Sequence, residues 1–300
     1  MTPLLPAQTL SGVDRVHHMD ALRLLRSLVT GSIDLIVTSP PYDNLRTYNG
    51  YTFPFEAIAH ESYRVLKEGG VLVWVVGDAT VNGSETLTSF RQALYFKDAV
   101  GFRMHDTMIW RKMGTDPPHK LIRYASVFEY MFVLTKGEPT TTRIDTFPRI
   151  DKQKKRSRRR PDGTLRRDIS GTGGGAFPNV WETAVGAMNR DDTMDHPAPF
   201  PEELAERHIL SWSNAGDTVL DYFGGSGTTA KMARNNGRRW ITGDISAEYC
   251  EIMRKRLAQP FTLPMFAASA LTRVANETEL GYTDRGGNGF GSTNVLKETA

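Results

Sequence analysis

Two short segments, far apart in the sequence, carry the residue types that could do chemistry. The first is Thr38-Ser39-Pro40-Pro41-Tyr42, which follows the apolar run Ile33–Val37. Consecutive prolines fix two φ angles, remove two N–H donors and keep the preceding residues extended, so the backbone is stiff and its carbonyls remain acceptors. With a serine oxygen before the prolines and a tyrosine ring after them, the segment suits a planar ring that bears an amine. The alternative is an ordinary strand-ending Pro-Pro turn.

The second segment is the glycine-rich run Asp221-Tyr222-Phe223-Gly224-Gly225-Ser226-Gly227-Thr228-Thr229, at a strand-to-helix junction. Glycines at such a junction let the backbone approach a ligand closely. Asp244 follows at about the 20-residue separation at which an acidic side chain meets ribose hydroxyls. The turn has no lysine of the kind that a phosphate-binding loop needs. The pattern therefore favours a nucleoside without phosphates, of which S-adenosylmethionine is the common one; a structural turn is the alternative.

Alternating strands and helices must position these two segments. Continuous apolar runs such as Val71–Val76 are typical of strands buried on both faces of a sheet. Further strands are expected at residues 33–37, 107–111, 128–135, 217–221 and 239–242, and helices at 22–29, 55–66, 89–100, 201–210, 228–235 and 246–257. This rhythm predicts an α/β fold, a doubly wound and mostly parallel sheet with helices on both faces.

Composition limits the class of protein. The 300 residues, 39% hydrophobic and 24% charged, allow one large α/β domain with an inserted part. No apolar run approaches the ~20 residues that span a membrane, and Met1–Gln8 lacks the features of a secretory signal. The single cysteine, Cys250, excludes an internal disulfide framework and a cysteine metal cluster. We expect a cytoplasmic protein without a metal.

Apolar periodicity is lost at residues 137–195, although order is expected to return at Asn179–Trp181. Within this stretch, seven of nine consecutive positions are basic: Lys152, Lys154, Lys155, Arg156, Arg158, Arg159 and Arg160. Such a run can contact DNA phosphates, which gives affinity and salt dependence rather than sequence choice. A solvated charged loop is the alternative. Residues 261–300 are expected to form a tail.

Together the motifs resemble the amino-methyltransferases that modify the exocyclic amine of adenine or cytosine in DNA. Ser39–Tyr42 looks like the catalytic tetrapeptide of that family, and Phe223–Thr229 looks like its cofactor loop. His196–Pro201 is similar to the segment that covers the cofactor. His18–Ala21 resembles a shorter element whose aspartate contacts the adenine of the cofactor.

The order of these motifs resembles the circularly permuted β class of the family. That resemblance implies a Rossmann-like sheet of seven strands, with a catalytic half at 13–136, a target-recognition insert at 137–195 and a cofactor half at 196–258. It also implies S-adenosylmethionine as cofactor, double-stranded DNA as partner and a target base that is flipped out of the duplex, because a stacked base is inaccessible.

The resemblance assigns roles residue by residue. The expected catalytic set is Ser39, Pro40, Pro41 and Tyr42. Within it, Ser39 and the Pro40 carbonyl would accept the hydrogens of the amine, and Tyr42 would stack on the base. Asp20 would meet the adenine ring, Asp244 the ribose, and Asp221 with the loop glycines the methionine end. The expected cofactor-binding set is Asp20, Ala21, Phe200, Asp221, Phe223, Gly224, Gly225, Ser226, Gly227, Thr228 and Asp244.

Several alternatives stay open at this point. Asp20 can equally be a helix N-cap, and Asp244 can cap the helix that begins near Ser246. Among members of the family, serine at the position of Ser39 favours methylation of cytosine at N4, and methylation of adenine at N6 is the alternative. A methyltransferase acting on RNA or a small amine, and a non-catalytic DNA-binding protein, are the competing functions. A homodimer is expected by analogy.

Overall fold

The computed structural model describes residues 13–41, 53–113, 124–141, 156–159, 165–168, 178–184 and 201–260. The chain divides into two units, Met1–Thr262 and Leu263–Ala300, and every described residue lies in the first. The predictions for Tyr42, Lys152, Lys154, Lys155, Arg160, His196, Phe200 and the tail at 261–300 lie outside the described residues.

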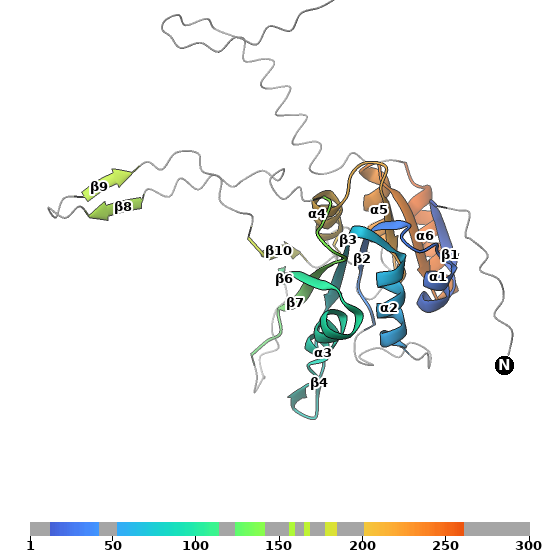
Figure 1. Ribbon diagram of the computed structural model, residues 1–300, viewed down its shortest axis with the longest axis horizontal. Helices are drawn as coiled ribbons and strands as arrows, with labels where there is room; N and C mark the ends of the chain where they lie inside the picture. Colours follow the sequence, from blue (N-terminus) through green and yellow to red (C-terminus); the bar gives the residue numbers. More distant parts are fainter. Residues whose placement is uncertain are drawn as a thin grey trace, which may run out of the picture. The chain divides into compact units, whose positions relative to one another are not determined.

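A large, mostly parallel sheet forms the centre of the first unit (Figure 1). Its strands are β1 (Arg15–His18), β2 (Ile33–Thr38), β3 (Leu66–Val76), β6 (Arg103–Met113), β7 (Phe128–Thr135), β10 (Val180–Ala184), β11 (Thr218–Asp221) and β12 (Arg239–Asp244). They lie in the order β1-β12-β11-β2-β3-β7-β6-β10, and β7 alone runs antiparallel to its neighbours. The predicted α/β fold class is confirmed, with eight strands in place of the expected seven.

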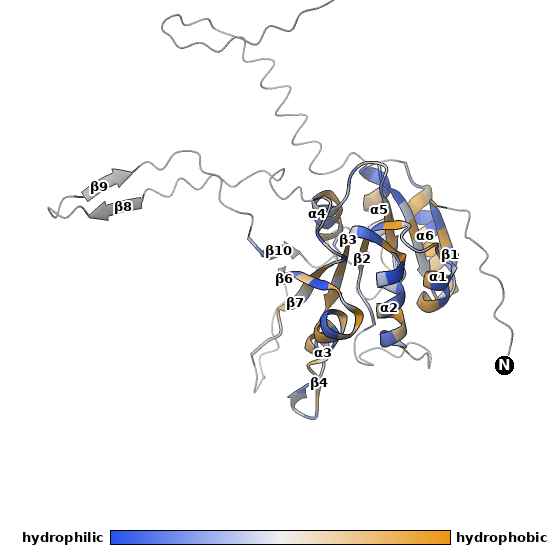
Figure 2. Ribbon diagram, in the orientation of Figure 1, coloured by the Kyte–Doolittle hydropathy of each residue, from blue (hydrophilic) through white to orange (hydrophobic). Residues whose placement is uncertain are grey.

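Helices cover both faces of this sheet. They are α1 (Ala21–Ser27), α2 (Phe55–Val65), α3 (Thr88–Tyr95) with a π-helical turn (Phe96–Val100), α4 (Glu202–Trp212), α5 (Thr228–Asn235) and α6 (Ala247–Ala258). Along β3, Leu72 and Trp74 pack with α1 and α2, whereas Val71 and Val73 pack with α4 and α5. The alternation follows from the two-residue period of a strand, and Figure 2 shows the apolar strands between helices of mixed polarity.

Strand order places the two predicted chemical segments together. β2 and β11 are hydrogen-bonded neighbours and run parallel, with Leu35 opposite Val219 and Ile36 opposite Leu220. Parallel neighbours end at the same edge of a sheet, and ligands of open α/β sheets bind outside the carboxyl ends of the strands. The residues after Thr38 and those after Asp221 therefore emerge side by side.

The structure differs from the sequence reading at three places in the sheet. Lys67–Gly70, which separate the helix expected at 55–66 from the strand expected at Val71–Val76, belong to β3. Leu66 already pairs with Ile33, ahead of a register shift. β1 was not predicted; it is a four-residue edge strand. β10 lies inside the stretch assigned to the insert, yet it pairs in parallel with β6 and extends the main sheet. Its Trp181 is buried, as is Trp110 of β6, so both tryptophans are core residues.

Two hairpins stand outside the main sheet. β4 (Thr80–Val81) pairs with β5 (Ser84–Glu85), and β8 (Arg156–Arg159) pairs with β9 (Leu165–Asp168). The second hairpin places part of the predicted basic run in a strand rather than a loop. Among the helices of the described ranges, none is long and apolar enough to cross a membrane.

Candidate active site at the carboxyl edge of the sheet

A buried hydrogen bond joins the ends of β2 and β11. The Thr38 hydroxyl donates to Oδ1 of Asp221 at 2.7 Å, and both side chains are buried. From the start of α5, the Thr229 hydroxyl donates to the Val37 carbonyl at 3.3 Å. Ser39 and Pro40 follow Thr38 directly. The proline segment and the glycine-rich segment thus meet, and Thr38, which the sequence reading left without a role, is the residue that connects them.

Asp221 lies in an environment that opposes its charge. Burial raises the pKa of Asp221 to about 6, although hydrogen bonds from Thr38 and from the Phe223 backbone N–H favour the ionised form; the nearby Asp244 carboxylate raises the pKa further. A buried carboxyl group with this pKa changes charge near neutral pH. It would be stabilised as a carboxylate by a positively charged ligand group at the same edge.

The glycine-rich loop is packed closely against α6 and β12. A Cβ on Gly224 would clash with Oγ1 of Thr242 and would lie 2.8 Å from the sulfur of Met253. Gly227 has φ +80°, and a Cβ there would lie 2.9 Å from Cγ of Met253. These two glycines are therefore required by packing behind the loop, whereas the sequence reading explained them by close approach of a ligand.

Asp244 holds the loop from the end of β12. Its Oδ2 accepts a hydrogen bond from the Gly225 N–H at 3.0 Å, and its Oδ1 accepts one from the Ser246 N–H at 2.9 Å. Burial raises the pKa of Asp244 above its ordinary value despite these bonds. The N-cap of α6 is Ser246, which accepts from the Tyr249 N–H. Because each carboxylate oxygen can accept a further hydrogen bond, Asp244 can hold the loop and still bind a hydroxyl.

Asp20 lies between the end of β1, which is the strand next to β12, and the start of α1. In the register of the two strands, His18 of β1 lies opposite Asp244 of β12. The Met19 N–H donates a hydrogen bond to the Asp244 carbonyl at 3.1 Å. Asp20 is the N-cap of α1, where its Oδ1 accepts from the Arg23 N–H at 2.9 Å. The prediction that Asp20 can cap a helix is thus confirmed. Asp20 is exposed, and its Oδ2 is a second oxygen that can accept a hydrogen bond. The next residue, Ala21, is buried.

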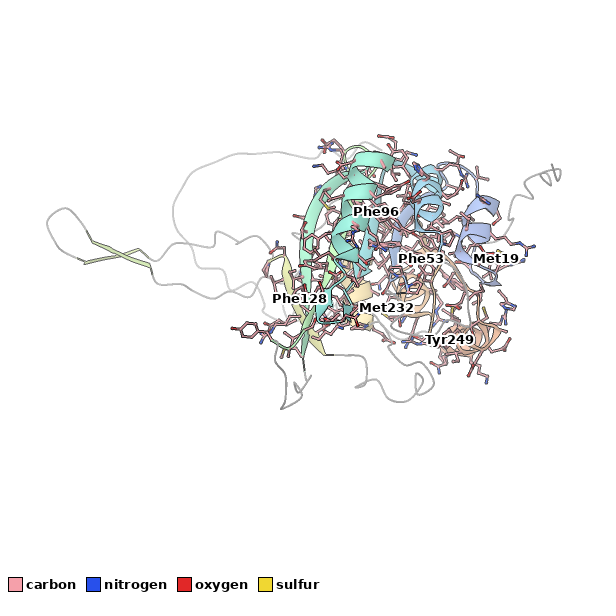
Figure 3. The ribbon with its side chains drawn as sticks, turned by 90° about the horizontal axis from the view of Figure 1, so that it is seen from below. Met19, Phe53, Phe96, Phe128, Met232 and Tyr249 are labelled. Atoms are coloured by element: carbon pink, nitrogen blue, oxygen red, sulfur yellow. The ribbon has the colours of Figure 1, made fainter. Side chains whose placement is uncertain are left out.

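Aromatic rings form the apolar part of the site. Phe223 of the loop lies edge-on to Phe53, with ring centroids 5.7 Å apart, and 5.0 Å from Tyr222. The Tyr222 hydroxyl is 2.8 Å from Oγ of Ser62 on α2, which ties the loop to this helix. Phe53 was not among the predicted site residues. Phe53 and Met19, both labelled in Figure 3, each pack against the core cluster that contains Leu24 and Trp74.

The site gathers three carboxylates and an aromatic side chain around one sheet edge. Asp20, Asp244 and Asp221 follow or end the adjacent strands β1, β12 and β11. Carboxylates suit the hydroxyls of a ribose and a positively charged amino group, and an aromatic ring suits the face of a purine. These acceptors and the aromatic ring therefore fit a nucleoside joined to a positively charged amino-acid portion. S-adenosylmethionine is a molecule of this kind.

Comparison with known proteins agrees with this arrangement. The family model described as "DNA methylase" matches residues 33–255. The orphan methyltransferase M.BamHII of Bacillus amyloliquefaciens is 51% identical over 240 residues, which is 75% of this chain and 89% of that protein.

Two solved structures are also similar. A putative DNA modification methylase of Thermus thermophilus, complexed with S-adenosyl-L-methionine, has a TM-score of 0.58 at 28% identity and covers 81% of this chain and 93% of its own. The cytosine-N4-specific PvuII DNA methyltransferase has a TM-score of 0.64 at 22% identity, and the match covers 87% of this chain and 92% of that enzyme. The second likeness extends to the fold alone.

The raised pKa of Asp221 predicts a pH effect on cofactor binding. Below about pH 6 the carboxyl group is protonated, and above it the carboxylate can attract the positive charge of S-adenosylmethionine. The dissociation constant of the cofactor should therefore fall as the pH rises from about 5 to about 7. In Asp221→Asn the same titration should lose this step, as measured by calorimetry at each pH. An unchanged pH profile in the variant would contradict the role of Asp221.

Proposed function

This chain belongs to the DNA methylase family, and we propose that it moves a methyl group from S-adenosylmethionine to the exocyclic amine of cytosine or adenine in a specific sequence of double-stranded DNA. One observation carries the proposal. The Ser-Pro-Pro segment and the glycine-rich loop, separated by most of the chain, leave adjacent parallel strands and are connected by the Thr38–Asp221 hydrogen bond.

The chain's own residues provide a binding site for the cofactor, which supplies an electrophilic methyl group when bound. Asp244 would accept hydrogen bonds from the ribose, and Asp20 would meet the adenine ring. Asp221 and the glycine-rich loop would hold the methionine end, and Phe223 would pack on the purine. This assignment is supported by the positions of the three carboxylates at neighbouring strand ends.

Activation of the amine is assigned to Ser39 and Pro40. The lone pair of an exocyclic amine is delocalised into the ring, so the nitrogen is a poor nucleophile. Two acceptors fixed on its hydrogens favour a tetrahedral, more basic nitrogen and act by orientation and preorganised electrostatics. Pro40 is buried, while Ser39 and Pro41 are half-buried, which suits a rigid wall at the edge of a site. Tyr42 would stack on the flipped base.

The basic run is the proposed DNA contact within the target-recognition region at 137–195. Its central residues lie in β8, paired with β9 so that Arg156 stands opposite Asp168 and Arg158 opposite Arg166. A two-stranded ribbon is one of the elements that the major groove of DNA admits. The phosphate contacts themselves would be independent of sequence.

Oligomeric state and location are part of the same proposal. A homodimer is supported by the exposed apolar side chains Leu87, Phe90 and Leu94 at α3, since a self-complementary apolar patch suits a two-fold interface; sedimentation equilibrium tests it. A DNA substrate supports a cytoplasmic location, which imaging of a tagged chain tests.

Methylation of DNA in vitro tests the function and identifies the base. Unmethylated DNA is incubated with the protein and S-adenosylmethionine, digested to nucleosides and analysed by mass. We expect N4-methylcytosine or N6-methyladenine, and serine at position 39 favours the former. Ser39→Ala, which removes one amine acceptor, should lose most of the product. A protein that binds the cofactor but modifies neither base would contradict the proposal.

Removal of the stacking ring separates catalysis from cofactor binding. Tyr42→Ala should lower turnover on DNA by about 10- to 100-fold, because base–aromatic stacking is worth ~1–3 kcal/mol. Its dissociation constant for S-adenosylmethionine should remain near that of the unaltered protein, since the ring is assigned to the base. Single-turnover rates and calorimetry measure the two quantities. Equal losses in both would remove the stacking role.

The basic run should determine the salt dependence of DNA binding. Neutralising Lys154, Arg156 and Arg158 together to glutamine should reduce the slope of log K against log salt by about 2–3, because each phosphate contact contributes ~0.9. Arg254→Gln, on the exposed face of α6, is a matched control for loss of a surface charge. If the triple variant keeps the full slope, the run does not contact DNA phosphates.

A further inference from the structure

A buried arginine lies behind the glycine-rich loop. Arg256 of α6 is 3% exposed. Its Nη1 donates to the Ser226 carbonyl and the Ser226 hydroxyl, each at 3.1 Å, and to the Thr228 hydroxyl at 2.9 Å. One nitrogen of the guanidinium group therefore contacts both the loop and the first residue of α5. Neither the cofactor-binding set expected from the sequence nor the strand-end carboxylates include this residue.

The second nitrogen of the same group is paired with an acid. Nη2 of Arg256 forms an ion pair with Glu202, and Lys231 of α5 donates to the same carboxylate at 2.8 Å. Burial alone would raise the pKa of Glu202, but Lys231 and Arg256 lower it below its ordinary value, so Glu202 is ionised at neutral pH. Glu202 is the first residue of α4, and it follows the 196–201 segment directly.

We propose that Arg256 is a positioning residue that sets the shape of the cofactor loop and connects it, through Glu202, to the first turn of α4. The inference rests on the proposed function for the identity of the ligand. A guanidinium group is planar and presents its donors in a fixed fork, so it holds two groups on different elements at a defined separation. A lysine ammonium is a point charge on a flexible stem and cannot hold both in this way.

The energetics fit a positioning role. A buried charge is costly unless it is paired and hydrogen-bonded, and an apolar side chain often packs as stably in its place. Here the charge is compensated by Glu202, while the other nitrogen, Nη1, lies within hydrogen-bond distance of two oxygens of Ser226 and of the Thr228 hydroxyl. Met253, from the same helix, packs on Gly224 and Gly227. Packing and hydrogen bonding from α6 thus both act on the loop.

The test compares Arg256→Lys, which keeps a positive charge beside Glu202, with Glu202→Gln and with the control Arg254→Ala. Arg254 pairs with Glu251 on the exposed side of the same helix. Binding of S-adenosylhomocysteine, a non-reactive probe, is measured by calorimetry. Arg256→Lys should weaken it about tenfold, the equivalent of one charge-assisted hydrogen bond, and Glu202→Gln should act in the same direction by less. Affinity for DNA and the control variant should be unchanged.

Hydrogen exchange of the cofactor-free protein gives a second readout. The loop amides of Gly225, Gly227 and Thr228 should exchange faster in Arg256→Lys than in the unaltered chain, while the strand amides of β11 and β12 should not. The inference is overturned if the unaltered protein binds the probe and Arg256→Lys binds it equally well with unchanged loop exchange. Failure of the unaltered protein to bind the probe would instead contradict the proposed function. General loss of protection across the sheet would show a structural role and also overturn the inference.

Discussion

The site depends on one interaction, the hydrogen bond between Thr38 at the end of β2 and Asp221 at the end of β11. Each residue is the last of its strand, and the two strands are parallel neighbours in the middle of the sheet. A rigid proline turn leaves one strand and a glycine loop leaves the other. If either strand occupied another place in the order, the proposed acceptors for an amine and the proposed binding loop for a methyl donor would lie at different parts of the edge.

The binding loop takes its shape largely from the elements behind it. Gly224 and Gly227 lack room for a side chain because Thr242 and Met253 occupy that space, and Asp244 accepts the amide of Gly225. The loop is therefore formed before a ligand arrives, so that little conformational entropy has to be lost on binding. The carboxylates that a ligand would meet also accept hydrogen bonds from the surrounding residues. Replacing one of them would therefore change both ligand binding and the local structure of the site.

Most core elements could be predicted from the sequence, although β3 begins at Leu66 rather than at Val71. The apolar run of β3, the whole of β7 and the whole of α5 follow from periodicity, and Asp221 and Asp244 follow from their places at strand ends. Short edge strands such as β1 carry too few residues for a period to be seen. The burial of Arg256 and its contact with the glycine loop could not be predicted. In the sequence it looks like any surface arginine of an amphipathic helix, and its partner Glu202 is 54 residues away in the chain. Such pairs are created by tertiary packing.

The pairing of β1 with β12 has a consequence for how the protein is made. These neighbouring strands come from opposite ends of the described chain, Arg15–His18 and Arg239–Asp244. A polypeptide leaves the ribosome amino end first, so β1 has no partner in the sheet until nearly the whole domain has been translated. β11, the glycine loop and α6 emerge equally late. The nascent chain therefore carries its proline turn for most of the synthesis of this domain without the glycine loop beside it, and the two halves of the proposed catalytic centre are joined only late in that synthesis.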